Sequence, residues 1–243
     1  MKSSQLILVA AIAAMLAGCG KENGKPAMNL NPKDPNVAAK VRQGMQEKQT
    51  AAAPRGDASV PLAQYQELRD GRQIVYAYYA TGAMPVDFEK ITAVISNEYR
   101  GEQDEFKKHD LINALKPGIT KEIDKAKQSA YYFMEMSDYP TVDKYDFSTQ
   151  TFKVQALSHS SAYRYFPNAS AYKIQFPGSE AFSALKVTDE NAARNIENLR
   201  LKNGLRLVVY FFVNDTELGQ TTLKAEIMRV RLLDKQGTVL AEQ

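Results

Sequence analysis

Residues 205–213 read Leu-Arg-Leu-Val-Val-Tyr-Phe-Phe-Val, a dense run of β-branched and aromatic side chains that is typical of a strand. Alternate positions form one apolar face of this strand: Leu205, Leu207, Val209, Phe211 and Val213. The opposite face is apolar as well, because it carries Val208, Tyr210 and Phe212. A strand that is covered on both faces lies inside a sheet rather than at its surface. The run therefore predicts a central strand with other elements packed on both of its sides.

The segments around this run predict further strands. Residues 221–233 repeat a strand pattern after a polar loop at 214–220, so the two segments predict a hairpin. A turn at 234–237 then leads into a short last strand at 238–241. Period-two alternation predicts four earlier strands, at 130–136, 151–157, 162–166 and 171–176. A helix at 188–198 interrupts them, with Thr188 or Asp189 as its N-cap.

Helical spacing dominates residues 62–127. Apolar stripes predict one helix from Tyr65 to Tyr79, a second from Phe88 to Tyr99 and a third at 106–115, and Pro117 suits the first turn of a fourth. The sequence therefore predicts an α+β fold in which a helical N-terminal half packs on a mainly antiparallel sheet. We expect one domain over residues 62–243, mostly helical at 62–128 and strand-rich at 129–243.

Composition excludes several kinds of chemistry. The chain has 243 residues, of which 44% are hydrophobic and 24% are charged, a balance typical of globular proteins. A single Cys excludes an internal disulfide and any Cys-cluster metal site, and two His residues leave little for a histidine-rich metal centre. A formal net charge of +3 lacks the basic excess of a nucleic-acid-binding protein. We therefore predict no metal, no cofactor and no nucleic-acid partner.

The first residues have the pattern of an export signal. Lys2 precedes eleven apolar residues, Leu6 to Leu16. A helix of that length spans about 17 Å, well short of the roughly 30 Å hydrocarbon core, so a permanent transmembrane helix is a poor interpretation.

The end of this segment, Leu16-Ala17-Gly18-Cys19, resembles the lipobox of bacterial lipoproteins. The resemblance implies that residues 1–18 are a signal peptide cleaved before Cys19. It also implies that the Cys19 thiol carries diacylglycerol and that the freed amine is usually acylated, for example by palmitate. Several acyl chains hold a protein on a bilayer, so Cys19 is the predicted membrane anchor. Gly20 follows in place of Asp, and the enterobacterial sorting rule then favours the outer membrane, facing the periplasm, over the inner membrane.

Residues 19–61 are predicted to be a flexible tether. All 23 aromatic residues lie at or after Tyr65, and the preceding segment is rich in Lys, Asn, Pro, Ala and Gln. Such a composition buries too little apolar surface to offset the entropy of ordering the chain. About 40 flexible residues reach roughly 35 Å, which is enough to hold the folded domain away from the lipid surface.

A second resemblance concerns the domain itself. It rests on Tyr145-Asp146-Phe147, on Phe152, on Phe166-Pro167 and on the C-terminal hairpin. In these residues the last part of the chain is similar to bacterial envelope proteins that are grouped only as domains of unknown function. The similarity covers about the last hundred residues. It implies no catalytic residue.

Few residues are candidates for catalysis. His109 lies among charged residues of a helix, which favours a solvated helix face. His159 lies in Ser158-His159-Ser160-Ser161, where a general base with a hydroxyl neighbour is conceivable. Asp138, Asp143 and Asp146 share one loop but match no calcium-binding loop, so we interpret them as surface acids.

The tyrosine content points to binding instead. The chain has 13 Tyr and no Trp, and Tyr163-Arg164-Tyr165 combines the residue types that are enriched at protein interfaces. We expect this tripeptide to contact a partner, although Tyr is also an ordinary strand and core residue. The sequence thus favours a non-catalytic accessory or immunity-type protein that binds another envelope protein. A periplasmic hydrolase acting on cell-wall or lipid material, or a carrier of an apolar ligand, remains the alternative.

Overall fold

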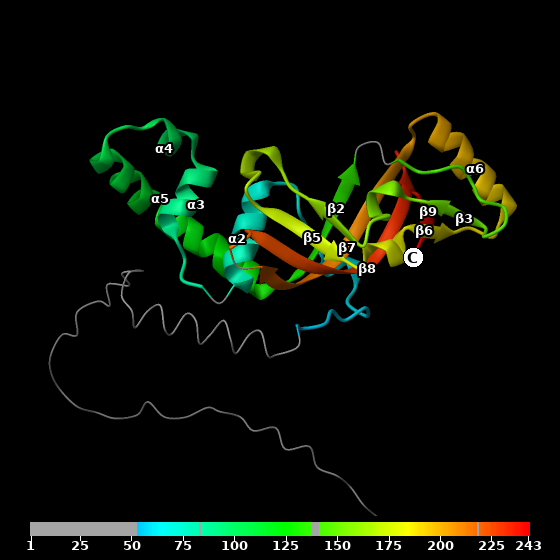
Figure 1. Cartoon of the computed structure of the whole chain (residues 1–243), viewed down its shortest axis with the longest axis horizontal. Coiled ribbons are helices and arrows are strands. Elements are labelled where there is room, and N and C mark those ends of the chain that lie inside the picture. The colour runs from blue at the N-terminus through cyan, green and yellow to red at the C-terminus, as the bar shows by residue number, and fades with distance from the viewer. Residues whose placement is uncertain (1–52, 83, 138–140, 218) are drawn as a thin grey trace, which may run out of the picture. The chain divides into compact units, whose positions relative to one another are not determined.

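The computed structural model describes residues 53–82, 84–137, 141–217 and 219–243. The predicted central strand is β7, Leu205–Glu217, which lies between the antiparallel neighbours β2, Tyr131–Ser137, and β8, Thr222–Asp234 (Figure 1). Its buried face carries the five alternating residues from Leu205 to Val213, and each of them is at most 3% exposed. The prediction of a central strand is confirmed.

The large sheet has the strand order β1-β2-β7-β8-β5-β4, and β9 pairs with the other end of β8. The bounds of the remaining strands of this sheet are Gln66–Glu67 for β1, Ser161–Arg164 for β4, Lys173–Pro177 for β5 and Val239–Glu242 for β9. A separate two-stranded sheet consists of β3, Thr151–Lys153, and β6, Ala184–Lys186.

The fold is α+β, but the sheet is mixed, whereas the sequence predicts a mainly antiparallel sheet. β1 runs parallel to β2, and β5 runs parallel to β8. Parallel partners need a long crossover. The helices lie between β1 and β2 in the chain, and β6, α6 and β7 lie between β5 and β8. Period-two alternation reports only which side chains share a face, so it could not reveal these pairing directions.

The helical half also differs in detail. Helix α2, Gly71–Thr81, contacts β7 and β8, whereas α5, Glu105–Gln128, packs mainly on α2, and α3, Phe88–Ile95, packs on α5. The helices are therefore stacked outward from the sheet and do not all lie on it. Two short elements complete this region: η1, Leu62–Gln64, and α4, Asn97–Gly101.

Two helix boundaries have local causes. The stripe from Phe88 to Tyr99 is divided between α3 and α4 because Ser96 adopts an extended conformation and its Oγ accepts the Tyr99 amide at 3.1 Å. In contrast, Pro117 lies inside the single helix α5 and does not begin a new one. A helix can absorb the loss of one N–H bond where the rest of its ladder continues.

The strand-rich half also contains helix α6, Glu190–Leu201, capped by Asp189, whose carboxylate accepts the Ala192 amide at 2.7 Å. This half of the domain also has three 3-10 turns within the described residues: η2, Gln155–Leu157, η3, Pro167–Ala169, and η4, Ser179–Phe182. The expected strand 151–157 thus ends at Lys153 and continues as η2.

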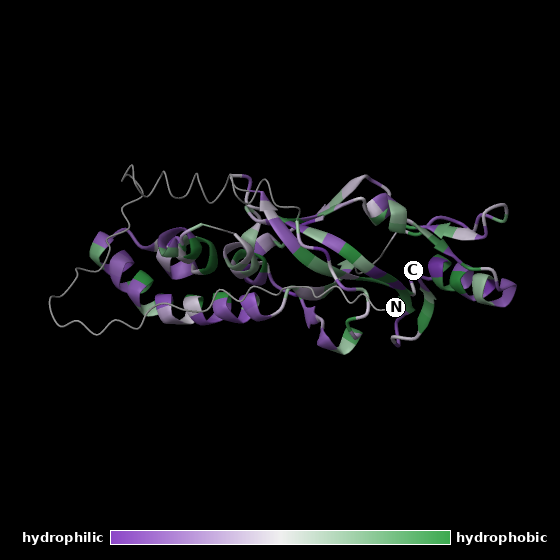
Figure 2. Ribbon diagram, turned by 90° about the horizontal axis from the view of Figure 1, so that it is seen from below, coloured by the Kyte–Doolittle hydropathy of each residue, from purple (hydrophilic) through white to green (hydrophobic). Residues whose placement is uncertain are grey.

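Aromatic rings from neighbouring strands fill the core. Phe176 meets Phe211 edge to face at 5.2 Å between ring centroids, and Tyr132 stacks on Phe211 at 6.0 Å. Burial raises the pKa of Tyr132 to about 12. Figure 2 shows the contrast between the apolar central strands and the largely hydrophilic α5.

The other face of the sheet carries a second aromatic cluster, to which Tyr65, Tyr131, Phe133, Tyr210 and Phe212 belong. Residues assigned to the tether by composition contact this face. The Asp57 amide donates to the Tyr131 hydroxyl at 2.8 Å, and the Gly56 amide donates to Glu226 at 3.2 Å. A Cβ on Gly56 would lie 2.8 Å from the Phe212 Cβ, so the backbone approaches the sheet closely here.

Candidate functional site

Strand β4 lies at the end of the large sheet and pairs with β5 alone. Within the described ranges, no strand pairs with its other edge. An edge strand presents backbone N–H and C=O groups that a further strand can bond. The predicted contact residues Tyr163 and Arg164 belong to this strand, and Tyr165 follows it directly.

The turn after β5 holds β4 in position. Gly178 has φ +77°, a left-handed conformation that favours glycine, and Ser179 follows it with 1% of its surface exposed. The Ser179 Oγ accepts the Ala162 amide at 2.9 Å and donates to the His159 carbonyl at 2.7 Å. One buried hydroxyl thus bonds the backbone of β4 and of the residues before it.

The structure separates the three predicted contact residues. Tyr163 and Tyr165 are 57% and 53% exposed. Arg164 pairs in register with the fully buried Ile174, so it lies on the core side of the sheet, as Ala162 does. The tripeptide therefore offers two exposed phenol rings and one inward-directed guanidinium, not a single continuous patch.

The guanidinium of Arg164 is partly buried, and no described residue serves as its counterion. Its Nε is inaccessible to solvent and has no hydrogen-bond acceptor, and no carboxylate forms an ion pair with it among the residues that the structure describes. Burial lowers the pKa of Arg164. A buried charge is costly when it is neither paired nor hydrogen-bonded. Among the residues that the structure describes, nothing at the site compensates this positive group.

A hollow of about 580 Å³ adjoins this guanidinium. Its lining comes from β4, from η2 and from the segments next to them: Thr141, Gln155, Ala156, His159, Ser161, Ala162, Tyr163 and Arg164. None of these residues is an Asp or a Glu. The hollow can thus accept an anionic group without meeting a carboxylate of its own lining.

His159 is brought to this hollow, but no hydroxyl is brought to its ring. Its side chain is exposed, the Ser158 Oγ donates to the Gln155 carbonyl at 2.8 Å, and the Ser179 Oγ bonds the His159 backbone. A general base must lie within hydrogen-bond reach of its nucleophile. No such pair forms around His159 in the described segments.

The other candidate residues stabilise local structure. His109 is exposed on α5 with the Asn113 amide 3.2 Å from its ring. Asp143 accepts the Gln155 side-chain amide at 2.6 Å. Asp146 accepts the Ser148 hydroxyl and amide, and these bonds lower its pKa. Asp138 lies outside the described residues, and within them no group of three His, Cys, Asp or Glu residues could hold a metal ion.

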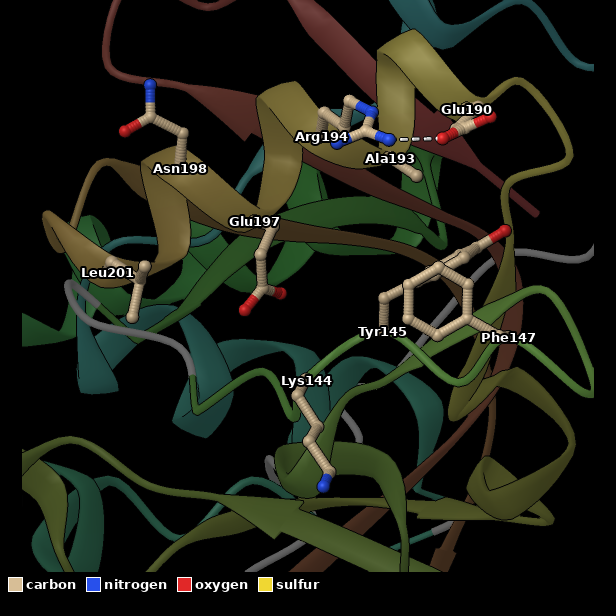
Figure 3. Close-up of a pocket in the computed structure, with 9 residues that line it drawn as sticks. All are labelled: Lys144, Tyr145, Phe147, Glu190, Ala193, Arg194, Glu197, Asn198 and Leu201. Carbon is tan, nitrogen blue, oxygen red and sulfur yellow. Dashed lines mark hydrogen bonds and ion pairs between the residues drawn. The ribbon is translucent and has the colours of Figure 1, made fainter.

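A second hollow, which no sequence pattern predicts, lies between α6 and the loop before β3. It measures about 550 Å³, and Figure 3 shows α6 on one side and the loop residues Lys144, Tyr145 and Phe147 on the other. Phe147 is 81% exposed and Leu201 is 71% exposed. Exposed apolar side chains that gather in one place mark contact surfaces.

This α6 groove has no spare negative charge. Glu190 pairs with Arg194, as the dashed line in Figure 3 marks. Glu197 pairs with Arg200, and this hydrogen bond lowers the pKa of the Glu197 carboxyl. Tyr145 is held by its hydroxyl, which donates to the Val187 carbonyl at 2.7 Å. Phe147 and Leu201 both line this groove, but nothing in their spacing along the sequence indicates that they lie close together.

The lipobox, Cys19 and Gly20 lie outside the described residues. Among the helices that are described, none is both long and apolar enough to cross a membrane. No family model matches the chain, and neither the curated proteins nor the solved structures contain a match to it.

Proposed function

We propose that the chain is a lipid-anchored cell-envelope protein whose folded domain binds another envelope protein and catalyses no reaction. The lipobox supports a lipid anchor at Cys19, and Gly20 supports the outer membrane, facing the periplasm. The domain would then act as an accessory or immunity-type protein on a tether.

The observation that carries the binding proposal is the open edge of β4. Two exposed tyrosines flank an arginine that has no counterion within the described ranges, beside a hollow of about 580 Å³. Tyr and Arg supply a large share of the energy of protein interfaces, because they combine apolar area with directed hydrogen bonds. The α6 groove is the competing location, and Phe147 is the exposed aromatic residue that represents it.

The test is capture of the partner from intact cells with a cleavable crosslinker and a C-terminally tagged chain. Alanine at both Tyr163 and Tyr165 should reduce the captured partner at least about tenfold, as for loss of interface hot spots. The same variant should keep the melting temperature, because both rings are more than half exposed. Phe147→Ala is the matched control and should leave capture unchanged.

Two results would contradict this proposal. Capture that depends on Phe147 and not on the tyrosines would move the contact to the α6 groove. Equal loss of partner and of thermal stability in the tyrosine variant would mean that these rings serve the fold.

The anchor has its own test. Radiolabelled palmitate should enter the wild-type chain and should not enter the Cys19→Ser variant. Label in that variant would refute the lipoprotein assignment.

A further inference from the structure

The guanidinium of Arg164, which no described carboxylate pairs with, limits what can occupy the hollow beside β4. The described lining residues include one arginine and no carboxylate. On the opposite face of the sheet, Lys173 adds a second positive charge at this end, with its Nζ 5.8 Å from the centroid of the Tyr163 ring. A ligand that neutralises this end of the sheet carries negative charge, and a planar carboxylate fits the fork of an arginine.

The edge of β4 places a second requirement on the ligand. Its backbone N–H and C=O groups can pair with an extended peptide segment. An extended segment that pairs with β4 bonds its free N–H and C=O groups. Side chains directly opposite each other in neighbouring strands have Cβ atoms about 4.5–5.5 Å apart. A Glu or Asp opposite Arg164 would therefore reach the guanidinium, on the core side of the sheet.

The exposed tyrosines define the neighbours of this acidic residue. Side chains alternate between the two faces of a strand, so the residues before and after the acid lie on the face of Tyr163. That ring is 57% exposed and can cover apolar side chains.

We propose that the β4 edge binds an extended acidic segment of the partner protein, added to the sheet as a further strand, with a Glu or Asp carboxylate on Arg164 and apolar residues on either side of it. This inference rests on the proposed binding function and names the chemistry of the partner. A second copy of this chain fits less well, because two β4 edges placed side by side would bring together two guanidinium groups, neither with a described counterion.

The experiment uses a fluorescein-labelled peptide of sequence Ser-Thr-Val-Glu-Val-Thr-Ser and its Gln counterpart, titrated with the full chain and followed by fluorescence anisotropy. Replacing Glu by Gln in the peptide should weaken binding about tenfold or more, the usual effect of losing a charge-assisted hydrogen bond. Arg164→Gln should weaken binding of the Glu peptide by the same factor. The two changes together should cost no more than either one, because both remove the same contact.

Two controls separate charge from strand pairing. Lys235→Gln removes one exposed positive charge in the turn before β9 and should leave binding unchanged. A Glu peptide with N-methylated valines cannot donate strand hydrogen bonds and should bind at least about tenfold more weakly. Equal binding of the methylated peptide would overturn strand addition. Arg164→Lys, checked by thermal unfolding, keeps the charge and should bind between wild type and Arg164→Gln.

Several outcomes would overturn the inference. Inward-directed charges also protect edge strands from aggregation. If Arg164→Gln self-associates in sedimentation and binds both peptides as wild type does, the role of Arg164 is to prevent aggregation through the β4 edge and not to bind an acidic segment. If partner capture in cells needs Tyr163 and not Arg164, the binding function stands and the acidic-strand inference is wrong.

Discussion

Replacing Ser179 by Ala should destabilise the backbone of β4 and of the residues just before it. The change removes one oxygen that serves two backbone groups, the Ala162 amide at 2.9 Å and the His159 carbonyl at 2.7 Å. A buried amide left without an acceptor costs about 1–3 kcal/mol, and the lost bond to the partly buried carbonyl adds about 1 kcal/mol. We expect the free energy of unfolding to fall by about 2–4 kcal/mol.

Ser183→Ala is the matched control. This serine is 9% exposed and lies in the same turn region, but its Oγ donates only to the Glu180 carbonyl three residues earlier, at 2.7 Å. Loss of one such local bond should cost about 1 kcal/mol or less.

The assay is urea denaturation of both variants of the full chain, together with hydrogen exchange of the β4 amides. Ser179→Ala should speed exchange at residues 162–164, whereas Ser183→Ala should not. Equal unfolding free energies for the two variants, with unchanged exchange in β4, would refute the claim that Ser179 positions this edge.

Three further perturbations test other parts of the structure. Asp70 is the N-cap of α2, and its carboxylate accepts the Arg72 amide. Burial raises the pKa of Asp70, but hydrogen bonds from the Arg72 amide and the Asn168 side chain lower this pKa by more. The cap is therefore fully effective above the unfolded pKa of about 4, and its contribution is lost as pH falls through the lower folded pKa. Asp70→Ala should therefore cost about 1–2 kcal/mol in urea unfolding at pH 7 and progressively less below pH 4; a cost independent of pH would contradict this. Gly56→Val places side-chain atoms against Phe212 and Met228, so exchange of the Asp57 amide should accelerate, and unchanged exchange would show that this segment does not depend on the close approach. Pro117→Ala restores a helical N–H at an exposed position of α5 and should raise the unfolding free energy by about 1–3 kcal/mol; a destabilised variant would refute this reading of α5.

The central strand could be predicted because its signal is local. Both faces of residues 205–213 are apolar, and a strand inside a covered sheet buries both faces. The helix at 188–198 was also predictable, since Asp189 caps it directly. Elements of this kind depend on residues that are near in sequence.

Pairing direction and stacking were not predictable, because they depend on distant contacts. Nothing in residues 171–176 indicates that β5 pairs in parallel with β8. The residues around Pro117 likewise do not indicate whether a helix begins there or continues through it, as α5 does. Composition placed residues 54–61 in the tether because they lack aromatic side chains, yet Asp57 bonds Tyr131 through its backbone, which composition does not report.

The candidate site was predictable only in part. Residue type pointed to Tyr163, Arg164 and Tyr165, but their division between two faces follows from the register of β4 against β5. That no described carboxylate pairs with Arg164 depends on residues distant in sequence. The α6 groove likewise is lined by both Phe147 and Leu201, which are 54 positions apart in sequence (201 − 147). These features exist only after folding.

The most direct test of the central claim is site-specific photo-crosslinking in living cells, with p-benzoylphenylalanine in place of Tyr163 and, separately, in place of Phe147. We predict a light-dependent adduct with one envelope protein from position 163, and none from position 147. An adduct from position 147 alone, or no protein adduct from position 163, would contradict the assignment of the β4 edge as the binding site.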